Sequence, residues 1–231
     1  MNAARVAVLT CAVAVASGCG AAGGGGRATV WVTRDRGAHL LHAQRVPAGL
    51  TAMQALARVA KVKTRYGGRF VVSIDGITSA PQRDWFYYVN GYLADRGAAE
   101  YRLRAGDVEW WDYRRWSDAA EDPVVVGAFP EPFLHGYDGK RRPSVVVTRR
   151  DAPRAAVARL ARLIRASRIT HALIRVPHGT NVLLLMHTRG LFFQAEPVRP
   201  VAGGRVVFVY SGDVSRLARH PHLARFRYGV P

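Results

Sequence analysis

A crowd of aromatic side chains within residues 74–113 is the feature that most constrains how this chain can fold. Several tyrosines and three of the five tryptophans lie in this one segment, the tryptophans being Trp85, Trp110 and Trp111. A large aromatic side chain hides about 150–250 Å² of surface when it is buried, and it dominates the energetics of cores and interfaces. The segment therefore predicts either a packed β-core or a surface that meets a ligand or a partner.

The alternation of side chains along a strand divides these aromatics into two sets. Trp85 and Tyr87 would share one face of a strand, whereas Tyr88 would lie on the other, and Trp110 and Trp111 would also point to opposite faces. Since a single helix covers only one face of a sheet, at least one set must lie outside that core. This set meets either a second domain or a ligand, and the sequence leaves both alternatives open.

The N-terminus has the three-part plan of a secretory signal, in which Arg5 precedes a short apolar run that small residues and Cys19 follow. The run is shorter than the ~20 residues that cross a bilayer as a helix. Residues 15–19 resemble a bacterial lipobox, in which the cysteine carries the lipid. We therefore expect residues 1–18 to be a signal peptide and Cys19 to be the lipid attachment site; an uncleaved anchor or ordinary secretion is the alternative.

Glycine-rich residues 19–26 predict a flexible tether between the lipid and the folded part of the chain. The only other cysteine, Cys11, lies in the predicted signal, so the mature chain would have no disulfide and no cysteine-based metal site. The remaining length is enough for one large domain or two small ones.

The chain has a formal net charge of +18, and arginine supplies nearly all of the positive charge. A basic chain is typical of nucleic-acid binding. However, export separates the protein from nucleic acid, and the arginines form no single basic block, so no nucleic-acid partner is expected. The abundance of Arg, Ala, Gly and Val is typical of a GC-rich codon supply, although a basic lipoprotein would also sit well on anionic lipid or wall polymers.

Residues 27–116 predict a first domain in which two strands precede a helix and further strands follow it. Thr51 is a suitable N-cap for a helix over residues 52–61. The expected strands are residues 28–35, 39–46, 70–77, 85–89, 101–103 and 108–113. A mixed sheet with one helix across its face is the β-grasp plan.

The same segment carries a series of short motifs in a specific order: Gly49-x-Thr51-x-x-x-Ala55-Leu56, Ile74-Asp75-Gly76, Trp85-x-Tyr87-Tyr88-x-Asn90-Gly91, Tyr101-x-Leu103 and Gly106-Asp107-Val108-x-Trp110. With these motifs, residues 28–116 resemble the transcobalamin-like C-terminal β-domain family, which bacteria carry in many short surface lipoproteins. In transcobalamin-type proteins this domain closes over a corrinoid held by a helical barrel, and this chain is too short and too β-rich to contain that barrel. The resemblance implies a β module with an aromatic, polar-rimmed face suited to a flat ligand, with cobalamin as the candidate, or to a partner protein.

The acidic, polar residues 117–123 predict a linker, and residues 124–231 predict a second small α+β domain of unknown type. Its expected strands are residues 124–129, 144–148, 171–176, 181–187, 191–196 and 205–210. Asp151 would cap a helix that runs to residue 167, and Asp213 would cap a last helix that runs to residue 219.

The candidate ligand-binding residues are the aromatic and turn residues of the first domain, although Asn90 is better explained as a turn former: Trp85, Tyr87, Tyr88, Asn90, Tyr92, Trp110 and Trp111. Catalytic motifs are absent from the sequence, since it has no Gly-x-Ser-x-Gly and no phosphate-binding loop. Three carboxylates lie close together, namely Asp107, Glu109 and Asp112. The first is explained by its turn, and for the other two we expect salt bridges or solvation on an edge-like strand.

His39 and His42 would point to opposite faces of a strand, which suits no single metal ion. We therefore expect no enzyme, no metal and no cofactor other than cobalamin as a candidate ligand. The sequence predicts an α+β protein, lipid-anchored on the extracytoplasmic face of the cell membrane, which presents an aromatic face to a small flat ligand as an accessory to an uptake system. A membrane transporter component is the candidate partner.

Two alternatives remain at this level. In the first, the protein is a basic, envelope-associated structural or interaction protein that binds anionic lipid, wall polymer or a partner protein, and the aromatics join its two domains. In the second, the C-terminal domain is an enzyme, although no group of residues in the sequence supports that hypothesis.

Overall fold

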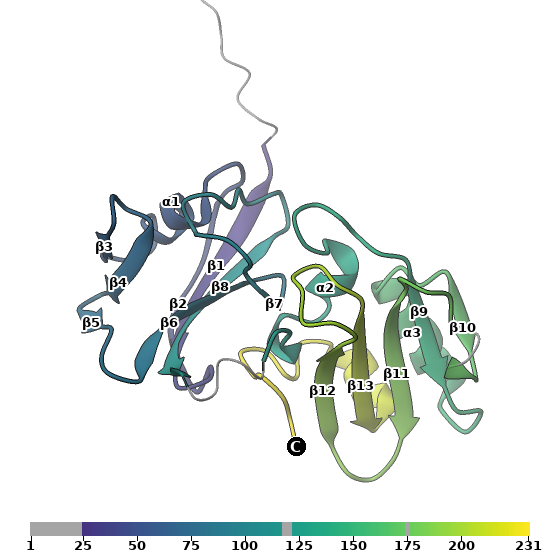
Figure 1. The fold of residues 1–231 in the computed structure, drawn as a ribbon. Coiled ribbons are helices and arrows are strands. Elements are labelled where there is room, and N and C mark those ends of the chain that lie inside the picture. Colours follow the sequence, from purple (N-terminus) through teal and green to yellow (C-terminus); the bar gives the residue numbers. More distant parts are fainter. Residues whose placement is uncertain (1–24, 117–121, 174–175) are drawn as a thin grey trace, which may run out of the picture.

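The computed structural model describes residues 25–116, 122–173 and 176–231. Its first sheet contains β1 (Arg27–Arg34), β2 (His39–Pro47), β6 (Arg83–Val89), β7 (Tyr92–Leu93) and β8 (Val108–Arg115) in the order β2-β1-β8-β6-β7. The central pair, β1 and β8, is parallel, and the other pairs are antiparallel. The sheet is therefore mixed, as the β-grasp prediction requires (Figure 1).

One helix and a small second sheet lie between β2 and β6. The helix α1 (Ala52–Leu56) begins at the predicted cap, since the Thr51 side chain and Gln54 form a reciprocal capping box. It is shorter than predicted and ends at Leu56, so the expected length was wrong. Buried Ala52, Ala55 and Leu56 join the same core as the inward residues of β1.

The second sheet consists of β3 (Val62–Arg65), β4 (Phe70–Ile74) and β5 (Ile77–Thr78). The sequence predicted one strand over residues 70–77, but the Asp75-Gly76 turn divides it, with both residues at positive φ. The strand β3 was not predicted. The expected strand at residues 101–103 is only an isolated bridge between Thr51 and Arg102.

Two short helices connect the N-terminal sheets to the rest of the chain. These are the 3₁₀ helix η2 (Val126–Ala128) and α2 (Glu131–Leu134). The prediction of a strand over residues 124–129 was wrong, because only Val124 forms a bridge, with Tyr92. The rest of this segment turns so that Phe129 and Phe133 reach the core.

The C-terminal unit is built on a sheet with the order β10-β9-β11-β13-β12. Its strands are β9 (Ser144–Thr148), β10 (Arg168–Thr170), β11 (Asn181–His187), β12 (Phe192–Pro197) and β13 (Val206–Gly212). Four strands are parallel, and β12 is an antiparallel edge. Together the two units give the predicted α+β fold. The strand expected at residues 171–176 was misplaced, since β10 ends at Thr170 and residues 171–173 are not in a strand. Residues 174 and 175 lie outside the described part of the chain.

Two helices, α3 (Arg154–Leu163) and α4 (Val214–Arg219), pack against each other and against one face of this sheet. Val157 and Leu160 of α3 share a core with Leu217 of α4 and Leu183 of β11. The predicted cap of α3 was wrong, because Pro153 occupies the N-cap position and Asp151 lies in the preceding loop, ion-paired with Arg149 at 3.5 Å.

The predicted cap of α4 is confirmed, since Asp213 Oδ1 accepts a hydrogen bond of 2.8 Å from the backbone N–H of Ser215. We expect Asp213→Ala to lower the free energy of unfolding by about 1 kcal/mol, because it leaves a helix N–H without its acceptor. Urea unfolding followed by circular dichroism would measure this. Asp151→Ala is the matched control, because that aspartate caps no helix, and an equal effect of both variants would contradict the assignment.

The last residues of the chain join the two units. Phe226 packs edge-on against Trp31 of β1 with centroids 4.9 Å apart, and Val230 forms a bridge to Phe193 of β12. Gly37, in the turn between β1 and β2, has a φ of +80°, and a Cβ added there would come within 1.7 Å of the Phe226 carbonyl oxygen. The approach of the turn to the C-terminal segment therefore leaves no room for a side chain at position 37.

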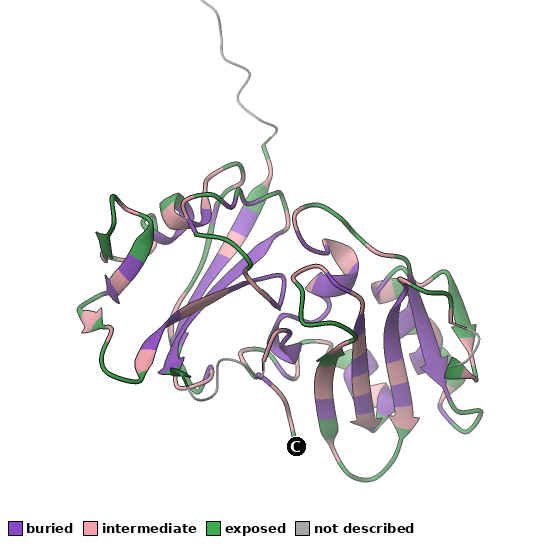
Figure 2. Ribbon diagram, in the orientation of Figure 1, coloured by how far each residue is buried: buried purple, intermediate pink, exposed green. Residues whose placement is uncertain are grey.

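The burial of residues follows the arrangement of the two large sheets. Buried residues fill the central strands of both large sheets, whereas exposed residues gather on the β3–β4 hairpin and the outer loops (Figure 2). One apolar core runs through both units, and it includes Val30, Tyr92, Phe129 and Phe208. Among the described residues, no helix is both long enough and apolar enough to span a bilayer.

Candidate functional site

The predicted aromatic residues lie on the antiparallel pair of β6 and β8. Tyr87 faces Trp111 and Tyr88 faces Trp110 in the register of this pair. The rings of Tyr87 and Trp111 stack with centroids 4.8 Å apart, and those of Tyr88 and Trp110 are 5.9 Å apart. The two sets therefore lie on opposite faces of the sheet, as the alternation predicted.

The first set forms part of the main core. Trp85 and Trp111 are buried, and each indole N–H has an acceptor, the Ile77 carbonyl for Trp85 and Glu109 Oε1 for Trp111. Tyr87 is half-buried and donates to the carbonyl oxygen of Arg96. In this set, Tyr87 is partly exposed, whereas Trp85 and Trp111 are buried.

The second set lies between the sheet and the C-terminal segment. Tyr88 and Trp110 are both fully buried and belong to one aromatic cluster with Trp31, Phe226 and Tyr228. The centroids of Trp110 and Tyr228 are 5.4 Å apart. The sequence left two alternatives open for this set, contact with a second domain or contact with a ligand. In the structure, these aromatics contact the second unit. The expectation of an open aromatic face at these residues is corrected.

Asn90 and Tyr92 complete the predicted residues, and both are buried. Asn90 has a φ of 50° in the Asn-Gly turn. Its side-chain N–H₂ donates to Asp107 at 2.7 Å and to the Gly136 carbonyl at 2.9 Å, and its oxygen accepts from Val108 N. Burial raises the pKa of Tyr92 to about 12. Asn90 is therefore a turn former, as expected, and it also fastens the turn to the segment after α2.

The carboxylates of β8 are not on an edge strand, so that expectation was wrong. The strand β8 is central, and Glu109 and Asp112 are both fully buried. Asp112 accepts hydrogen bonds from Thr33 Oγ1 at 2.6 Å, from the backbone N–H groups of Arg36 and Gly37, and from the Tyr228 hydroxyl at 2.9 Å. It thus ties the sheet to the C-terminal segment.

An apolar hollow remains at the outer side of β6, beside the predicted aromatics. It has a volume of about 540 Å³ and is lined by Phe70, Asp84, Trp85, Phe86, Tyr87, Leu93, Ala94 and Trp116. Trp116 and Phe70 are 59% and 44% exposed, so two large apolar side chains stand open to solvent here. Trp85 and Tyr87 belong to the predicted set, whereas the sequence gave no signal for Phe70 and Trp116. Among the described residues, this hollow is where the predicted aromatics reach the surface.

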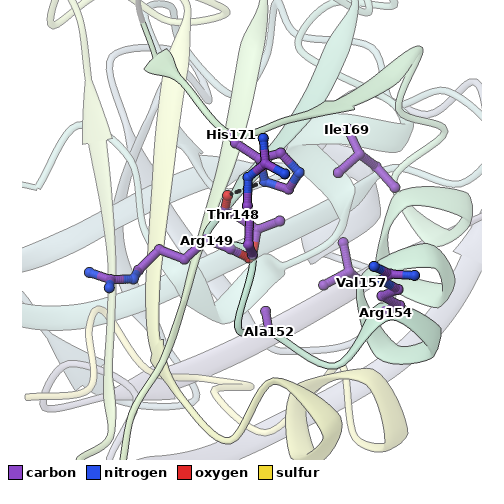
Figure 3. Close-up of a pocket in the computed structure, with 8 residues that line it drawn as sticks. Thr148, Arg149, Ala152, Arg154, Val157, Ile169 and His171 are labelled. Carbon is purple, nitrogen blue, oxygen red and sulfur yellow. Dashed lines mark hydrogen bonds between the residues drawn. The ribbon is translucent and has the colours of Figure 1, made fainter.

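A second recess lies in the C-terminal unit, where β9 and β10 end and α3 begins. It has a volume of about 410 Å³ and is lined by Thr148, Arg149, Arg150, Ala152, Arg154, Val157, Ile169 and His171. Figure 3 shows His171 next to Thr148, with Arg154 beside Val157 and Arg149 extending away from them. The His171 ring is fixed, because its Nδ1 donates to the Thr148 carbonyl over 2.8 Å. The sequence did not indicate this group of residues.

The remaining residues considered in the sequence analysis are Cys19 and two histidines of β2, His39 and His42. Cys19 lies outside the described residues, so its lipid attachment stays a prediction. His42 Nε2 is 2.5 Å from Asp75 Oδ2, and His39 Nδ1 is 3.3 Å from Asp35 Oδ2. Within the described parts of the chain, no group of three or more His, Cys, Asp or Glu residues is arranged to hold a metal ion.

A known domain family matches part of the N-terminal unit. Residues 49–115 match DUF4430, a domain of unknown function. This match covers less than half of the chain and lies inside the segment for which the sequence predicted the transcobalamin-like domain; the likeness to transcobalamin itself stays a prediction. No curated protein matches the chain.

A solved structure is also similar to part of the chain. It is a protein of Ruminococcus gnavus described as a "putative metal binding protein", with 16% identity and a TM-score of 0.32. The similarity covers 39% of this chain and 97% of that one. At this low identity and TM-score, it supports no conclusion about the ligand of this protein.

Proposed function

We propose that this protein is a non-enzymatic binding protein, lipid-anchored through Cys19 on the extracytoplasmic face of the cell membrane. Its N-terminal unit would bind a small flat ligand in the apolar hollow at β6. The observation that carries this proposal is the exposure of Phe70 and Trp116 around that hollow. Ligand sites are typically apolar recesses of about 300–1,000 Å³ with a few polar groups, and Asp84 supplies one here.

The size of the hollow limits how the candidate ligand would bind. A corrinoid is larger than about 540 Å³, so the hollow would receive one edge of the ring while the rest stayed in solvent or met a partner. Such partial burial agrees with a role as an accessory that passes the ligand to a membrane transporter component. Stacking of a flat ring on Trp116 and Phe70 would stabilise the complex.

A titration of the full chain with cobalamin, followed by tryptophan fluorescence corrected for absorption by the ligand, tests this proposal. We expect saturable quenching, and we expect Phe70→Ala to weaken the affinity about three- to tenfold because an aromatic contact is lost. Leu173→Ala is the matched control, because Leu173 is also exposed but lies in the C-terminal unit. Its affinity should equal that of the wild type.

Two results would contradict the proposal. One is quenching that does not saturate, and the other is an equal effect of Phe70→Ala and Leu173→Ala. Either result would favour the alternative of a basic, envelope-associated protein, in which the net charge of +18 holds the chain on anionic lipid or wall polymer.

A further inference from the structure

We propose that the recess of the C-terminal unit binds a small organic phosphate. The phosphate would contact Arg150, Arg154 and His171, and the organic part would lie on Ala152, Val157 and Ile169. This site is distinct from the apolar hollow at β6, and the proposal does not depend on the function proposed for that hollow.

The charges around the recess are the first argument. Three arginines and His171 line the recess. Of these arginines, Asp151 forms an ion pair with Arg149. Among the described residues, neither Arg150 nor Arg154 has an ion-pair partner, and both are exposed. Guanidinium groups bind phosphate through paired, charge-assisted hydrogen bonds, and two unpaired cations beside a helix start match a dianion better than a monoanion.

The position in the fold is the second argument. The recess lies outside the carboxyl ends of the parallel strands β9 and β10, which is where open α/β sheets bind their ligands. The helix α3 begins at Arg154, has no acidic residue in its first turn, and receives no side-chain cap from any described residue. Its dipole therefore adds positive potential that nothing in that turn offsets.

The base of the recess gives the third argument, because it is apolar. Ala152 and Val157 are buried, and Ile169 of β10 is 44% exposed. Figure 3 shows Arg154 beside Val157, with Ile169 on the same side of the recess. An exposed isoleucine next to cationic groups is suited to a ligand that has both an apolar part and an anionic part. Free phosphate alone would leave this base uncovered.

Calorimetric titration of the full chain with phenyl phosphate at physiological salt tests the site. We expect saturable binding that Arg154→Gln weakens about tenfold, since a charge-assisted hydrogen bond is lost. Arg159→Gln is the matched control, because Arg159 is exposed on the same helix but does not line the recess. It should leave the affinity within about twofold. Circular dichroism would check that both variants are folded.

Titrations with further ligands test the anionic part and the apolar part of the proposed site separately. Inorganic phosphate should bind several-fold more weakly than phenyl phosphate, and Ile169→Ala should reduce that difference. Binding that is lost equally in Arg154→Gln and Arg159→Gln would overturn the site in favour of a general attraction to the basic surface. Benzoate binding as tightly as phenyl phosphate would overturn the assignment to phosphate. Phosphatidylglycerol vesicles that bind through Arg154, without any binding of phenyl phosphate, would overturn the soluble ligand in favour of a lipid headgroup.

Discussion

Replacement of Trp110 by alanine is expected to lower the free energy of unfolding by about 3–5 kcal/mol, the range observed when a large buried aromatic is removed. The Trp110 ring is fully buried and contacts Trp31, Tyr88 and Tyr228. Its indole N–H donates to Thr33 Oγ1 over 2.8 Å. The loss of this side chain would therefore leave a cavity between the N-terminal sheet and the C-terminal segment. Urea unfolding followed by circular dichroism would measure the change.

Trp116→Ala is the matched control for this experiment. Trp116 is 59% exposed, so its removal should change the free energy of unfolding by less than about 0.5 kcal/mol. A loss below 1 kcal/mol in Trp110→Ala would mean that the C-terminal segment does not cover this ring. In that case the second aromatic set would be open to a ligand, and the function of this face would have to be reconsidered.

The sequence predicted that two aromatic sets face opposite sides of a sheet, because alternation along a strand depends only on local geometry. It could not predict what covers the second set. Phe226 and Tyr228 lie more than a hundred residues after Trp110, and their own surroundings carry no pattern that pairs them with this strand. The contact depends on how the C-terminal segment returns to β1 and β8, which is a property of the whole fold.

Local signals predicted some elements well and others poorly. The Asn90-Gly91 turn and the Asp213 cap were predicted, because each is specified by residues within a few positions. The helix α1 is shorter than its apolar pattern, because residues 57–61, which were expected to be helical, form a turn and irregular backbone before β3 begins at Val62. Val62, just after the expected helix, begins a strand because it pairs with Ile74 of β4, and its local sequence pattern does not indicate that pairing.

The basic recess shows why this site could not be predicted. Arginine is spread along the entire chain, and Arg150 and Arg154 do not differ from the others in their sequence surroundings. Their grouping with His171 requires the parallel pairing of β9 with β10, and the sequence prediction placed the second strand a few residues too late. An error of this size in one strand was enough to hide the recess.

Replacement of Glu109 by glutamine is expected to stabilise the protein at neutral and alkaline pH. Glu109 is fully buried in β8, and burial raises the pKa of its carboxyl group well above the usual range. Its Oε1 accepts from the Trp111 indole N–H, whereas its Oε2 has no hydrogen-bond partner among the described residues. An amide keeps the acceptor for Trp111 and removes the charge that the core disfavours.

The sign of the pH dependence follows from this shift. Because the pKa is higher in the folded state, the folded protein binds more protons than the unfolded chain between the two pKa values. The wild type therefore loses stability as the pH rises from the unfolded pKa through the folded pKa. We therefore expect the stability of Glu109→Gln relative to the wild type to increase as the pH rises from 4 to 8. Near pH 4 the pH-dependent part of this difference should vanish.

Urea unfolding of both proteins between pH 4 and pH 8 would measure this difference. Glu196→Gln is the matched control, because Glu196 is exposed on β12 and should give no such pH-dependent difference. Asp107, whose pKa burial also raises, contributes a slope of the same sign to both proteins and cancels in the comparison. Parallel stability curves for the wild type and Glu109→Gln would mean that Glu109 titrates normally. The carboxyl group would then have to reach water, and the core around Trp111 would be more open than its packing indicates.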